Sequence, residues 1–457
     1  MNVETLRLPG YITEVFDALD RAELPVWLVG GCLRDLLLGK PPHDWDFATP
    51  CPPDAVKEKL SVAGISSWDT GIKHGTITFR HNKRSYEITT FRVDGPYEDF
   101  RRPKWVEYTT SLREDLARRD FTINAMAYHR REGLSDPFGG AEDIKNRVIR
   151  AVGSPRDRLR EDALRIMRGI RFAGGLGFSL EDSLAGAIEE NAGLLLNISP
   201  ERVAAELSAI LILPSPKEAL ELMGRLGIWR HIIPELAKTQ GFEQRSSHHD
   251  LCVYGHTALT VENIEPSLPL RLAALLHDIA KPVVFTVDEK GKGHFYHHET
   301  VGARMTAEIM DKYRFSHDLR DQVVTLIRHH LLHIKDLSDA DLRRVVSKLP
   351  KPREENIELI LKLQKADLLA SVYDEDSLVD FEIFASRLLA IPASGCPLDL
   401  SDLAVTGGEL EGLGIAPADR GKAQKAMLEM VLSDPGENTR ETLLWVASFF
   451  AGEPKSE

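Results

Sequence analysis

The N-terminal third of the chain alternates short apolar runs with turn residues, a pattern typical of a domain that mixes strands and helices. The apolar run 26–29 ends at two glycines, which predicts a buried strand followed by a turn. The next apolar run predicts a helix that ends at Gly39. Residues 75–93 predict a hairpin of two β-rich runs around a polar tip at 81–84.

From about residue 155 the apolar positions recur at helical spacing almost to the end of the chain. Ser199 followed by Pro200 predicts a helix start, because serine caps helices and proline fits their first turn. A chain of 457 residues is too long for one hydrophobic core, so two to four domains are expected. The pattern as a whole predicts an α/β head followed by an extended helical body.

A helix that begins near Glu161 separates polar from apolar side chains. At 100° per residue the apolar side chains up to Ala173 fall on one face, and Asp162, Arg165 and Arg168 fall along the other. One interpretation is an amphipathic helix in which Asp162 and Arg165 form an i,i+3 ion pair, worth roughly a few tenths of a kcal/mol. The other is a polar face that binds a ligand.

Composition narrows the function classes. The four cysteines form no CxxC pair, which argues against a zinc ribbon or a disulfide framework and fits a reducing compartment. No apolar signal core is present, and no apolar run approaches the roughly 18 residues that span a bilayer, so we expect a cytoplasmic protein without membrane association. The net charge of −13 does not favour nucleic acid. Dense arginines over residues 101–171 indicate either a basic cleft on an acidic body or solvated helix faces.

Two acids separated by one residue, Asp44 and Asp46, follow the glycine turn. On a strand their side chains point the same way, and they repel each other unless a cation lies between them. Oxygen ligands of this kind suit Mg²⁺, which binds a few carboxylates together with substrate phosphates. Glu87, on a predicted neighbouring strand, is either a third acid of this site or an exposed strand glutamate.

The glycine turn adds a phosphate site. Gly30 and Gly31 leave backbone room for a triphosphate, and Arg34 can pair with its oxygens. The combination of strand, glycine pair, helix and alternating acids predicts a nucleotidyltransferase site.

Several segments, in order along roughly the first 210 residues, carry a resemblance to a known family. LVGGCLRDLLLGKPPHDWDFAT resembles the nucleotide-binding signature of class II tRNA nucleotidyltransferases, the CCA-adding enzymes of the polymerase-β-like superfamily. EDLARRDFTINAMAY and DPFGGAEDI are similar to the family's second motif and the segment that follows it. EDALRIMRGIRFA and SPERVAAEL are similar to its base-selecting helix and its last neck motif.

The resemblance implies that Asp162 and Arg165 choose the base. A carboxylate accepts from the exocyclic amine of cytosine or adenine, and an arginine donates to the adjacent ring nitrogen. Uracil and guanine present a carbonyl and a ring N–H there, so both contacts would clash. Protein would thus replace a nucleic-acid template, with Arg168 and Arg171 binding phosphate or supporting the pair.

The resemblance assigns the sugar and triphosphate to Arg118, Arg119, Asp120 and Asn124 of the second motif. Two adjacent arginines on a helix cannot both face one ligand, so we expect only one of Arg118 and Arg119 to bind the nucleotide. The alternative for this pair is a solvated helix start.

Residues 92–116 resemble the intact flexible loop of relatives that add the terminal A, which argues against an enzyme that adds only C. An enzyme that adds only A stays open. So does a bacterial poly(A) polymerase, which shares the head, although the Ala-Met-Ala-Tyr ending of the second motif favours the CCA group.

The C-terminal half resembles the HD phosphohydrolase superfamily, because a His-Asp pair ends an apolar helix with further ligands on both sides. The matching residues are His256, His277, Asp278 and Asp367, with His298 and His330 as candidates for a second metal. Imidazole plus carboxylate suits Ni²⁺, Mn²⁺, Fe or Zn²⁺, which activate water for attack on a phosphoester. Lys281 could pair with the phosphate. The alternative is a helical tRNA-contacting body that merely retains these residues.

The resemblance implies an α+β fold, in which a small polymerase-β-like nucleotidyltransferase head with a mixed sheet precedes an elongated all-α neck and body that includes the HD domain. We expect the head over 1–145, the neck over 146–215, a connector over 216–250, the HD domain over 251–375 and a tRNA-binding region over 376–457.

The sequence therefore predicts an enzyme that adds C, C and A to the 3′ end of tRNA from CTP and ATP, with Mg²⁺ and with Asp44, Asp46 and Glu87 as catalytic residues. It would contact the acceptor stem and elbow of tRNA, and no obligate protein partner is evident. Two other classes remain: an HD phosphohydrolase whose head only binds RNA, and a non-catalytic RNA-binding protein. The complete acidic and Asp–Arg sets weigh against both.

Overall fold

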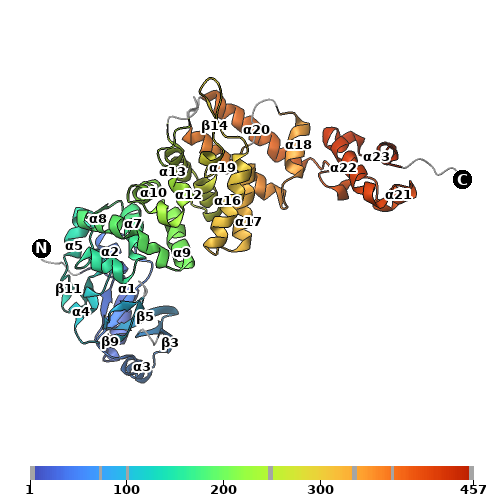
Figure 1. Cartoon of the computed structure of the whole chain (residues 1–457). Helices are drawn as coiled ribbons and strands as arrows, with labels where there is room; N and C mark the ends of the chain where they lie inside the picture. Colours follow the sequence, from blue (N-terminus) through green and yellow to red (C-terminus); the bar gives the residue numbers. More distant parts are fainter. Residues whose placement is uncertain are drawn as a thin grey trace. The chain divides into compact units, whose positions relative to one another are not determined.

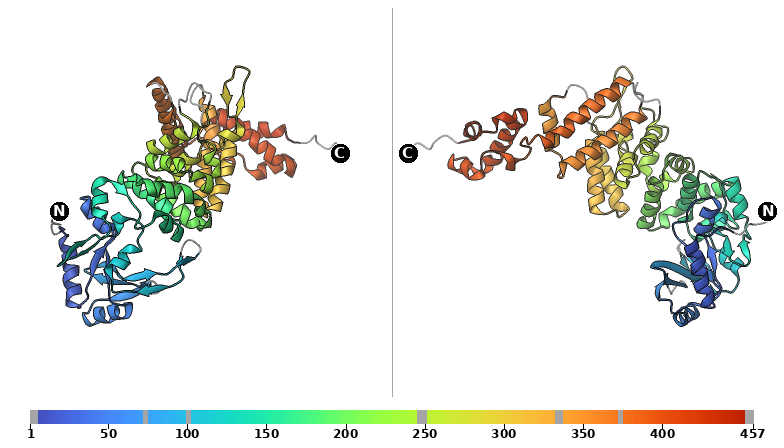
Figure 2. Two further views of the ribbon diagram at one scale, coloured as in Figure 1. Left: turned by 60° about the vertical axis from the view of Figure 1, so that its left-hand side comes forward. Right: turned by 180° about the vertical axis from the view of Figure 1, so that it is seen from behind.

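The computed structural model describes residues 6–71, 75–98, 102–244, 251–331, 337–371 and 375–451 (Figures 1 and 2). The chain divides into two compact units, Met1–Ala237 (unit 1) and Lys238–Glu457 (unit 2). The finer division into five segments stays a prediction.

A seven-stranded mixed sheet forms the first half of unit 1, drawn in blue to cyan in Figure 1. Its order is β11-β10-β1-β2-β5-β4-β3; β2 and β5 run parallel, and the other neighbours are antiparallel. The strands are β1 (Trp27–Val29), β2 (Asp46–Thr49), β3 (Ser67–Gly71), β4 (Thr76–His81), β5 (Arg84–Thr90), β10 (Ala127–His129) and β11 (Gly133–Ser135). The predicted α/β head is thus confirmed.

The predicted hairpin is β4 and β5. Its turn residues Asn82 and Lys83 have φ of 47° and 66°, the left-handed pair that a tight turn between two antiparallel strands requires.

Aromatic side chains hold β2 in the core. Phe47 of β2 packs edge-on against Phe16 of helix α1 (Gly10–Arg21), with ring centroids 5.5 Å apart. It also packs against Phe79 and Tyr86 of the hairpin, both at 6.2 Å. The strand that begins with one of the two predicted acids is therefore fixed on both sides.

Unit 1 has helices between its strands along the sequence and, from α6 on, a mainly helical second half. The helices after the first strands are α2 (Gly31–Leu37), α3 (Pro53–Val62), α4 (Leu112–Ala117), the short η2 (Thr122–Asn124), α5 (Gly140–Asn146), α6 (Pro155–Glu161), α7 (Arg165–Leu176), α8 (Asp182–Asn191), α9 (Pro200–Leu211), α10 (Lys217–Arg225), α11 (Trp229–Ile232) and α12 (Pro234–Ala237). Helix α9 begins at Pro200 after Ser199, as predicted.

The single helix expected from Glu161 is wrong. Helix α6 ends at Glu161, and α7 begins only at Arg165. Between them Asp162 is extended, with φ −136° and ψ 102°, and its Oδ1 accepts from the backbone N–H of Leu164 at 3.2 Å. Such a local side-chain bond competes with helical hydrogen bonding and breaks the helix there.

Unit 2 is helical apart from a short hairpin, β14 (Thr286–Val287) and β15 (Gly293–His294). Its helices are α13 (Val253–Asn263), α14 (Leu268–Leu276), α15 (Lys281–Val284), α16 (His298–Lys312), α17 (His317–His329), α18 (Asp339–Ser347), α19 (Arg353–Ala370), α20 (Glu375–Ala393), α21 (Gly407–Gly412), α22 (Pro417–Ser433) and α23 (Arg440–Ser448). Every residue from Leu270 to Leu276 of α14 is buried, so this helix delivers the His277–Asp278 pair to the interior.

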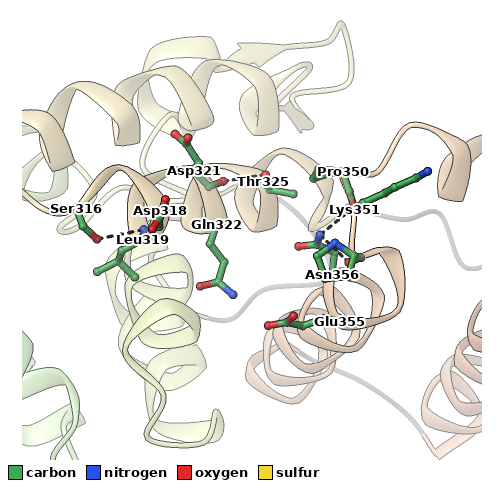
Figure 3. A pocket seen from close by; sticks show the side chains of 11 residues that line it. Ser316, Asp318, Leu319, Asp321, Gln322, Thr325, Pro350, Lys351, Glu355 and Asn356 are labelled. Carbon is green, nitrogen blue, oxygen red and sulfur yellow. Dashed lines mark hydrogen bonds between the residues drawn. The ribbon is translucent and has the colours of Figure 1, made fainter.

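A hollow of about 700 Å³ lies between the starts of α17 and α19 (Figure 3). Asn356 donates to the backbone carbonyls of Pro350 and Pro352, each at 3.0 Å, and Ser316 accepts from the N–H of Leu319 at 3.4 Å. These bonds satisfy backbone groups at the two helix starts.

Within the described part of the chain, no helix combines the length and apolarity that crossing a bilayer requires.

Gly140→Ala tests how tightly α5 is packed against η2. A Cβ at Gly140 would lie 2.2 Å from the carbonyl oxygen of Thr122, so η2 must shift. We expect a loss of about 1–3 kcal/mol in the free energy of unfolding, measured with urea. The control is Gly186→Ala in α8, where no atom lies within 4 Å and a gain of up to about 1 kcal/mol is expected. Equal stability of the two variants would contradict this packing.

Candidate active site and candidate metal centre

A cavity of about 370 Å³ in unit 1 gathers most of the residues predicted for the nucleotide site. It is bordered by the glycine turn after β1, the segment after α4 and the start of α7. Its lining residues are Gly30, Gly31, Arg34, Asp46, Arg118, Arg119, Asp120, Asn124, Asp162, Arg165, Arg168 and Phe172. We refer to it as the head cavity.

The acids beside the head cavity come from adjacent segments. Asp46 begins β2 and lies in register with Glu87 of the parallel strand β5. Asp44 precedes the strand rather than lying on it as expected, because β2 begins only at Asp46. Trp45 between them is buried while both acids are exposed, so Asp44 and Asp46 still face the same side.

The pKa of Asp46 lies above its ordinary value. Loss of surrounding water raises it most, Arg119 opposes the rise, and the charges of Glu87 and Asp44 add to it. Negative charge that is crowded in this way favours a divalent ion near Asp44 and Asp46. Within the described residues, these two acids and Glu87 do not form a compact group of three ligands like those of unit 2.

The glycine turn gives room to two guanidinium groups. Gly30 has φ +80°, and a Cβ there would lie 3.0 Å from Nη1 of Arg119. A Cβ at Gly31, the first residue of α2, would lie 3.4 Å from Nη2 of Arg34. A larger residue at Gly30 would therefore disturb the arginines that line the cavity.

Asp120 is the most fully bonded acid of the head cavity. Its Oδ2 accepts from Nε and Nη2 of Arg168 at 2.9 and 2.6 Å, and its Oδ1 accepts from Asn124 at 3.1 Å. Asn124 in turn accepts from Nη1 of Arg34 at 2.8 Å. Burial alone would raise the pKa of Asp120, but Arg168 and the hydrogen bonds hold it below its ordinary value. The carboxylate therefore stays charged and fixes two arginines.

Arg165 is buried and held by three groups. Its Nη1 donates to Glu161 at 2.6 Å and to the carbonyl of Arg158 at 2.9 Å, and its Nη2 donates to the carbonyl of Arg118 at 3.1 Å. These bonds fix the guanidinium plane at the cavity wall.

Asp162 bonds to Arg202 and not to Arg165. Nη2 of Arg202 donates to Asp162 Oδ2 at 2.9 Å. The predicted i,i+3 ion pair is wrong because Asp162 lies outside the helix that carries Arg165. Both side chains nevertheless line the head cavity, where a base could meet them together.

Arg118 and Arg119 both line the cavity, and the expectation that only one of them binds the nucleotide stays a prediction. Helix α4 ends at Ala117, and the two arginines therefore follow the helix. The buried Asp115 accepts from Arg118 at 2.8 Å and from Arg119 at 3.4 Å. One carboxylate thus orients both guanidinium groups.

Arg171 does not line the head cavity. Its Nε donates to Glu206 at 2.8 Å, and its guanidinium carbon lies 4.7 Å from the ring centroid of Phe172. Arg34 and Arg168 lie 5.0 and 5.4 Å from the same ring.

Phe172, Arg202 and Glu206 were missed by the sequence analysis. Phe172 lies seven residues after Arg165, two helical turns along α7, and this spacing could have placed it on the cavity wall. Arg202 and Glu206 belong to the segment SPERVAAEL, but no local signal connects Arg202 to an acid 40 residues earlier.

The predicted flexible loop reaches the head cavity. The hydroxyl of Tyr97 donates to Asp94 at 2.8 Å, and the Tyr97 ring lies 6.0 Å from the guanidinium of Arg165. Residues 99–101 of the loop lie outside the described residues. The loop's described strands are β6 (Arg92–Asp94) paired with β9 (Val106–Tyr108) and β7 (Tyr97–Glu98) paired with β8 (Arg102–Pro103).

Unit 2 brings together all six predicted ligands of the HD site. They form two groups, and within each group the ligand atoms lie within 4.8 Å of one another. The groups are His256, His277 and Asp367, and Asp278, His298 and His330. All of these side chains are buried except that of Asp367, which is partly exposed.

The four histidines share one orientation, with Nδ1 placed against a backbone carbonyl. The partners are Ala370 for His256 at 3.3 Å, Ala274 for His277 at 2.8 Å, Phe295 for His298 at 2.8 Å and Ile327 for His330 at 2.7 Å. A neutral imidazole that donates from Nδ1 leaves the Nε2 lone pair for a metal. Nε2 of His277 and of His298 are buried and make no well-aligned hydrogen bond within the described residues.

The charges of the two groups also fit a cation. Burial alone would raise the pKa of Asp278 and of Asp367, but neighbouring histidines, and Lys281 beside Asp278, hold both well below their ordinary range. Burial, followed by the charges of His277 and His298, lowers the pKa of His330 to about 4. Ionised carboxylates and a neutral His330 are the forms in which these groups bind metal. Burial alone would lower the pKa of His277, but Asp278 and Asp367 raise it to about 10, so His277 has to release a proton when it binds a metal.

Lys281 contacts a carboxylate in this structure. Its Nζ lies 2.6 Å from Asp278 Oδ2 and donates to Gln244 at 2.7 Å. The expected pairing with a phosphate stays a prediction, and it requires Lys281 to exchange or share this partner.

Family models match three parts of the chain. A poly A polymerase head domain matches residues 26–150, a probable RNA and SrmB-binding site of polymerase A matches 177–239, and an HD domain matches 253–371. The histidine groups thus lie in the third matched part. The head cavity draws on the first matched part and on Asp162, Arg165, Arg168 and Phe172, which lie between the first and second matched parts.

Curated relatives match a little under half of the chain. The CCA-adding enzyme of Lactobacillus delbrueckii subsp. bulgaricus is 47% identical over 217 residues, and that of Listeria monocytogenes is 46% identical over 209. Each match covers 46% of this chain and 54% and 52% of the relative, respectively. The chain therefore spans about half the length of the curated relatives it matches.

Solved structures match almost the whole chain. The Bacillus stearothermophilus CCA-adding enzyme in complex with CTP is 27% identical, with a TM-score of 0.67 over 96% of this chain and 97% of that chain. A CCA-adding enzyme with ATP, 21% identical with a TM-score of 0.61, shares the fold. The chain thus matches, in order, the models of a poly A polymerase head domain, a probable RNA and SrmB-binding site of polymerase A and an HD domain, and its resemblance to the class II tRNA nucleotidyltransferases is confirmed.

Proposed function

We propose that this protein adds C, C and A to the 3′ end of tRNA from CTP and ATP and releases pyrophosphate. The observation that carries the proposal is the head cavity, whose lining includes Asp46, Asp162 and Arg165. A metal-binding acid and a pair of side chains that can read a base would then lie in one cavity. The 3′ hydroxyl of the RNA attacks the α-phosphate, and the bond to the leaving pyrophosphate breaks.

The acids supply the site for a divalent cation, for which Mg²⁺ is the best match to oxygen ligands. Mg²⁺ held by Asp44 and Asp46 would neutralise phosphate charge and favour ionisation of the attacking hydroxyl. Glu87, in register with Asp46, adds negative charge that strengthens this binding.

The arginines bind the triphosphate and hold it in place. Arg34 is fixed through Asn124, and Arg118 and Arg119 are fixed through Asp115. Their orientations are set before the nucleotide arrives, so binding spends little free energy on ordering side chains.

The choice of base follows from the hydrogen-bonding groups of Arg165 and Asp162 that are left for a ligand. Arg165 uses three of its five N–H groups in described bonds, which leaves two to donate to a ring nitrogen. The carboxylate of Asp162, which lines the same cavity, can accept a hydrogen bond from the exocyclic amine of the base. Cytosine and adenine supply an amine next to a ring nitrogen acceptor, whereas uracil and guanine leave both protein groups unpaired. An enzyme that adds only A, or a poly(A) polymerase, would use the same pair.

The histidine groups favour a second activity, metal-dependent hydrolysis of a phosphoester. Four Nε2 atoms and two ionised carboxylates converge without any of the head-cavity residues. Ni²⁺, Mn²⁺, Fe or Zn²⁺ fits this donor set and would supply Lewis acidity.

Helices after residue 150 would bind the acceptor stem and elbow of tRNA by shape and phosphate contacts.

Asp162→Asn tests base selection. An Asn amide can donate to the carbonyl of uracil, so we expect discrimination against UTP to fall by about 10- to 100-fold while C and A incorporation into tRNA lacking CCA weakens. The matched control is Asp157→Asn, an exposed acid on α6. Unchanged selection among the four NTPs would mean that the base is read elsewhere. If wild type incorporates neither C nor A, the proposed function itself fails.

Asp46→Asn tests whether the Asp46 carboxylate destabilises the fold without metal and binds a divalent metal when one is added. A carboxyl whose pKa is raised by folding destabilises the fold once pH exceeds that pKa, and the penalty vanishes at lower pH. Without divalent metal at pH 8 we expect the variant to melt slightly higher than wild type, with the gap shrinking as the pH falls towards the ordinary pKa of an aspartate. Added Mg²⁺ should raise the melting temperature of wild type and of the Glu58→Gln control but not of the variant, which should also lose nucleotide addition. A variant that Mg²⁺ stabilises as much as wild type would contradict the metal site.

Asp278→Asn with Asp367→Asn tests the histidine groups. These isosteric changes keep the volume of the site and remove both carboxylate ligands. We expect loss of bound transition metal, measured by elemental analysis, and of hydrolysis of 2′,3′-cyclic AMP, with C and A incorporation retained. His294→Gln, which lies outside both groups, serves as control. Full metal content in the double variant would contradict this site, and loss of nucleotide addition in a folded variant would contradict two independent sites.

A further inference from the structure

A second cavity of about 530 Å³ adjoins the head cavity and has no assigned role. The two cavities share Arg34 and Phe172 as lining residues. The full lining is Arg34, Asp35, Lys40, Pro41, His43, Arg171, Phe172, Gly175, Leu176 and Leu213. We refer to it as the side cavity.

The side cavity is rich in positive charge although the chain carries a net charge of −13. Arg34, Lys40 and Arg171 line it, together with the imidazole of His43. Its single lining acid, Asp35, accepts from Arg34 at 2.8 and 2.9 Å and is therefore neutralised. The residues that line the side cavity therefore carry more positive than negative charge.

The surplus comes from Lys40, because Arg34 is paired with Asp35 and Arg171 with Glu206. Arg171 pairs with Glu206 through Nε alone, which leaves its Nη atoms without a described hydrogen bond. Within the described residues, no ion pair is formed by Lys40 or His43, and both are exposed. These donors are available to an anion that enters from solvent.

Phe172 gathers the cations at the boundary between the cavities. The guanidinium carbons of Arg34 and Arg171 lie 5.0 and 4.7 Å from its ring centroid. Contact with the ring face holds the two guanidinium groups close together, although each is also paired with a carboxylate, Asp35 or Glu206. The lining also includes the apolar side chains of Pro41, Leu176 and Leu213, which suit a sugar or a base.

We propose that the side cavity is a second anion site, which binds a phosphate group of a reaction partner next to the bound nucleotide. The proposal rests on the proposed function, because the phosphate comes either from the RNA strand or from the released pyrophosphate. Arg171 then acts here and not on the incoming nucleotide.

Lys40→Gln, alone and combined with His43→Gln, tests the site, with Lys40→Arg as rescue. The control is Lys59→Gln, an equal change of charge beside a different cavity. If RNA is the source, KM for tRNA lacking CCA rises roughly 10-fold and the salt slope of tRNA binding falls by about 1, while KM for CTP stays within about twofold. If pyrophosphate is the source, its inhibition constant rises instead by a similar factor.

The proposal is overturned if neither tRNA nor pyrophosphate binding changes by more than about twofold relative to Lys59→Gln, or if only KM for CTP rises. Equilibrium binding of tRNA and of inorganic pyrophosphate to wild type and variants decides the matter even if wild type transfers no nucleotide. In that case the proposed function fails while the anion site is still tested.

Discussion

The buried carboxylate of Asp120 is the constraint on which the head cavity depends. It is charged inside the protein and accepts four hydrogen bonds, two from Arg168 on α7 and two from the turn that contains Asn124. Loss of one partner would leave an uncompensated buried charge, which costs about 3–5 kcal/mol. The same carboxylate therefore ties the neck helix α7 to the head and, through Asn124, sets the position of Arg34.

Both sites in this chain use the same physical device: a polar group binds its ligand well because a second group has already fixed its orientation. In the head cavity, Glu161 and two backbone carbonyls hold Arg165, and Asp115 holds two further arginines. In unit 2, backbone carbonyls hold the Nδ1 side of each histidine. Preorganised donors of this kind select their ligand by shape and hydrogen bonding rather than by net charge.

Local patterns in the sequence predicted the parts of the structure that depend on neighbours along the chain. The apolar helix before His277 brings that residue into one of the two ligand groups, as predicted. The alternation of Asp44 and Asp46 predicted two acids that face one side, although Asp44 precedes the strand. The break at Asp162 was missed because an acid before an apolar run looks the same whether it lies in the helix or interrupts it. The bond from Arg202 to Asp162 and the parallel pairing of β2 with β5 join distant segments, for which spacing carries no signal.

The central claim is that protein side chains alone choose the nucleotide. It is tested most directly by equilibrium binding of CTP, ATP, UTP and GTP to the wild-type protein in Mg²⁺ without any RNA. The account predicts that CTP and ATP bind measurably more tightly than UTP and GTP, by about 1–3 kcal/mol for the mismatched base contacts. Equal affinity for all four nucleotides would contradict it, because base choice would then require the RNA.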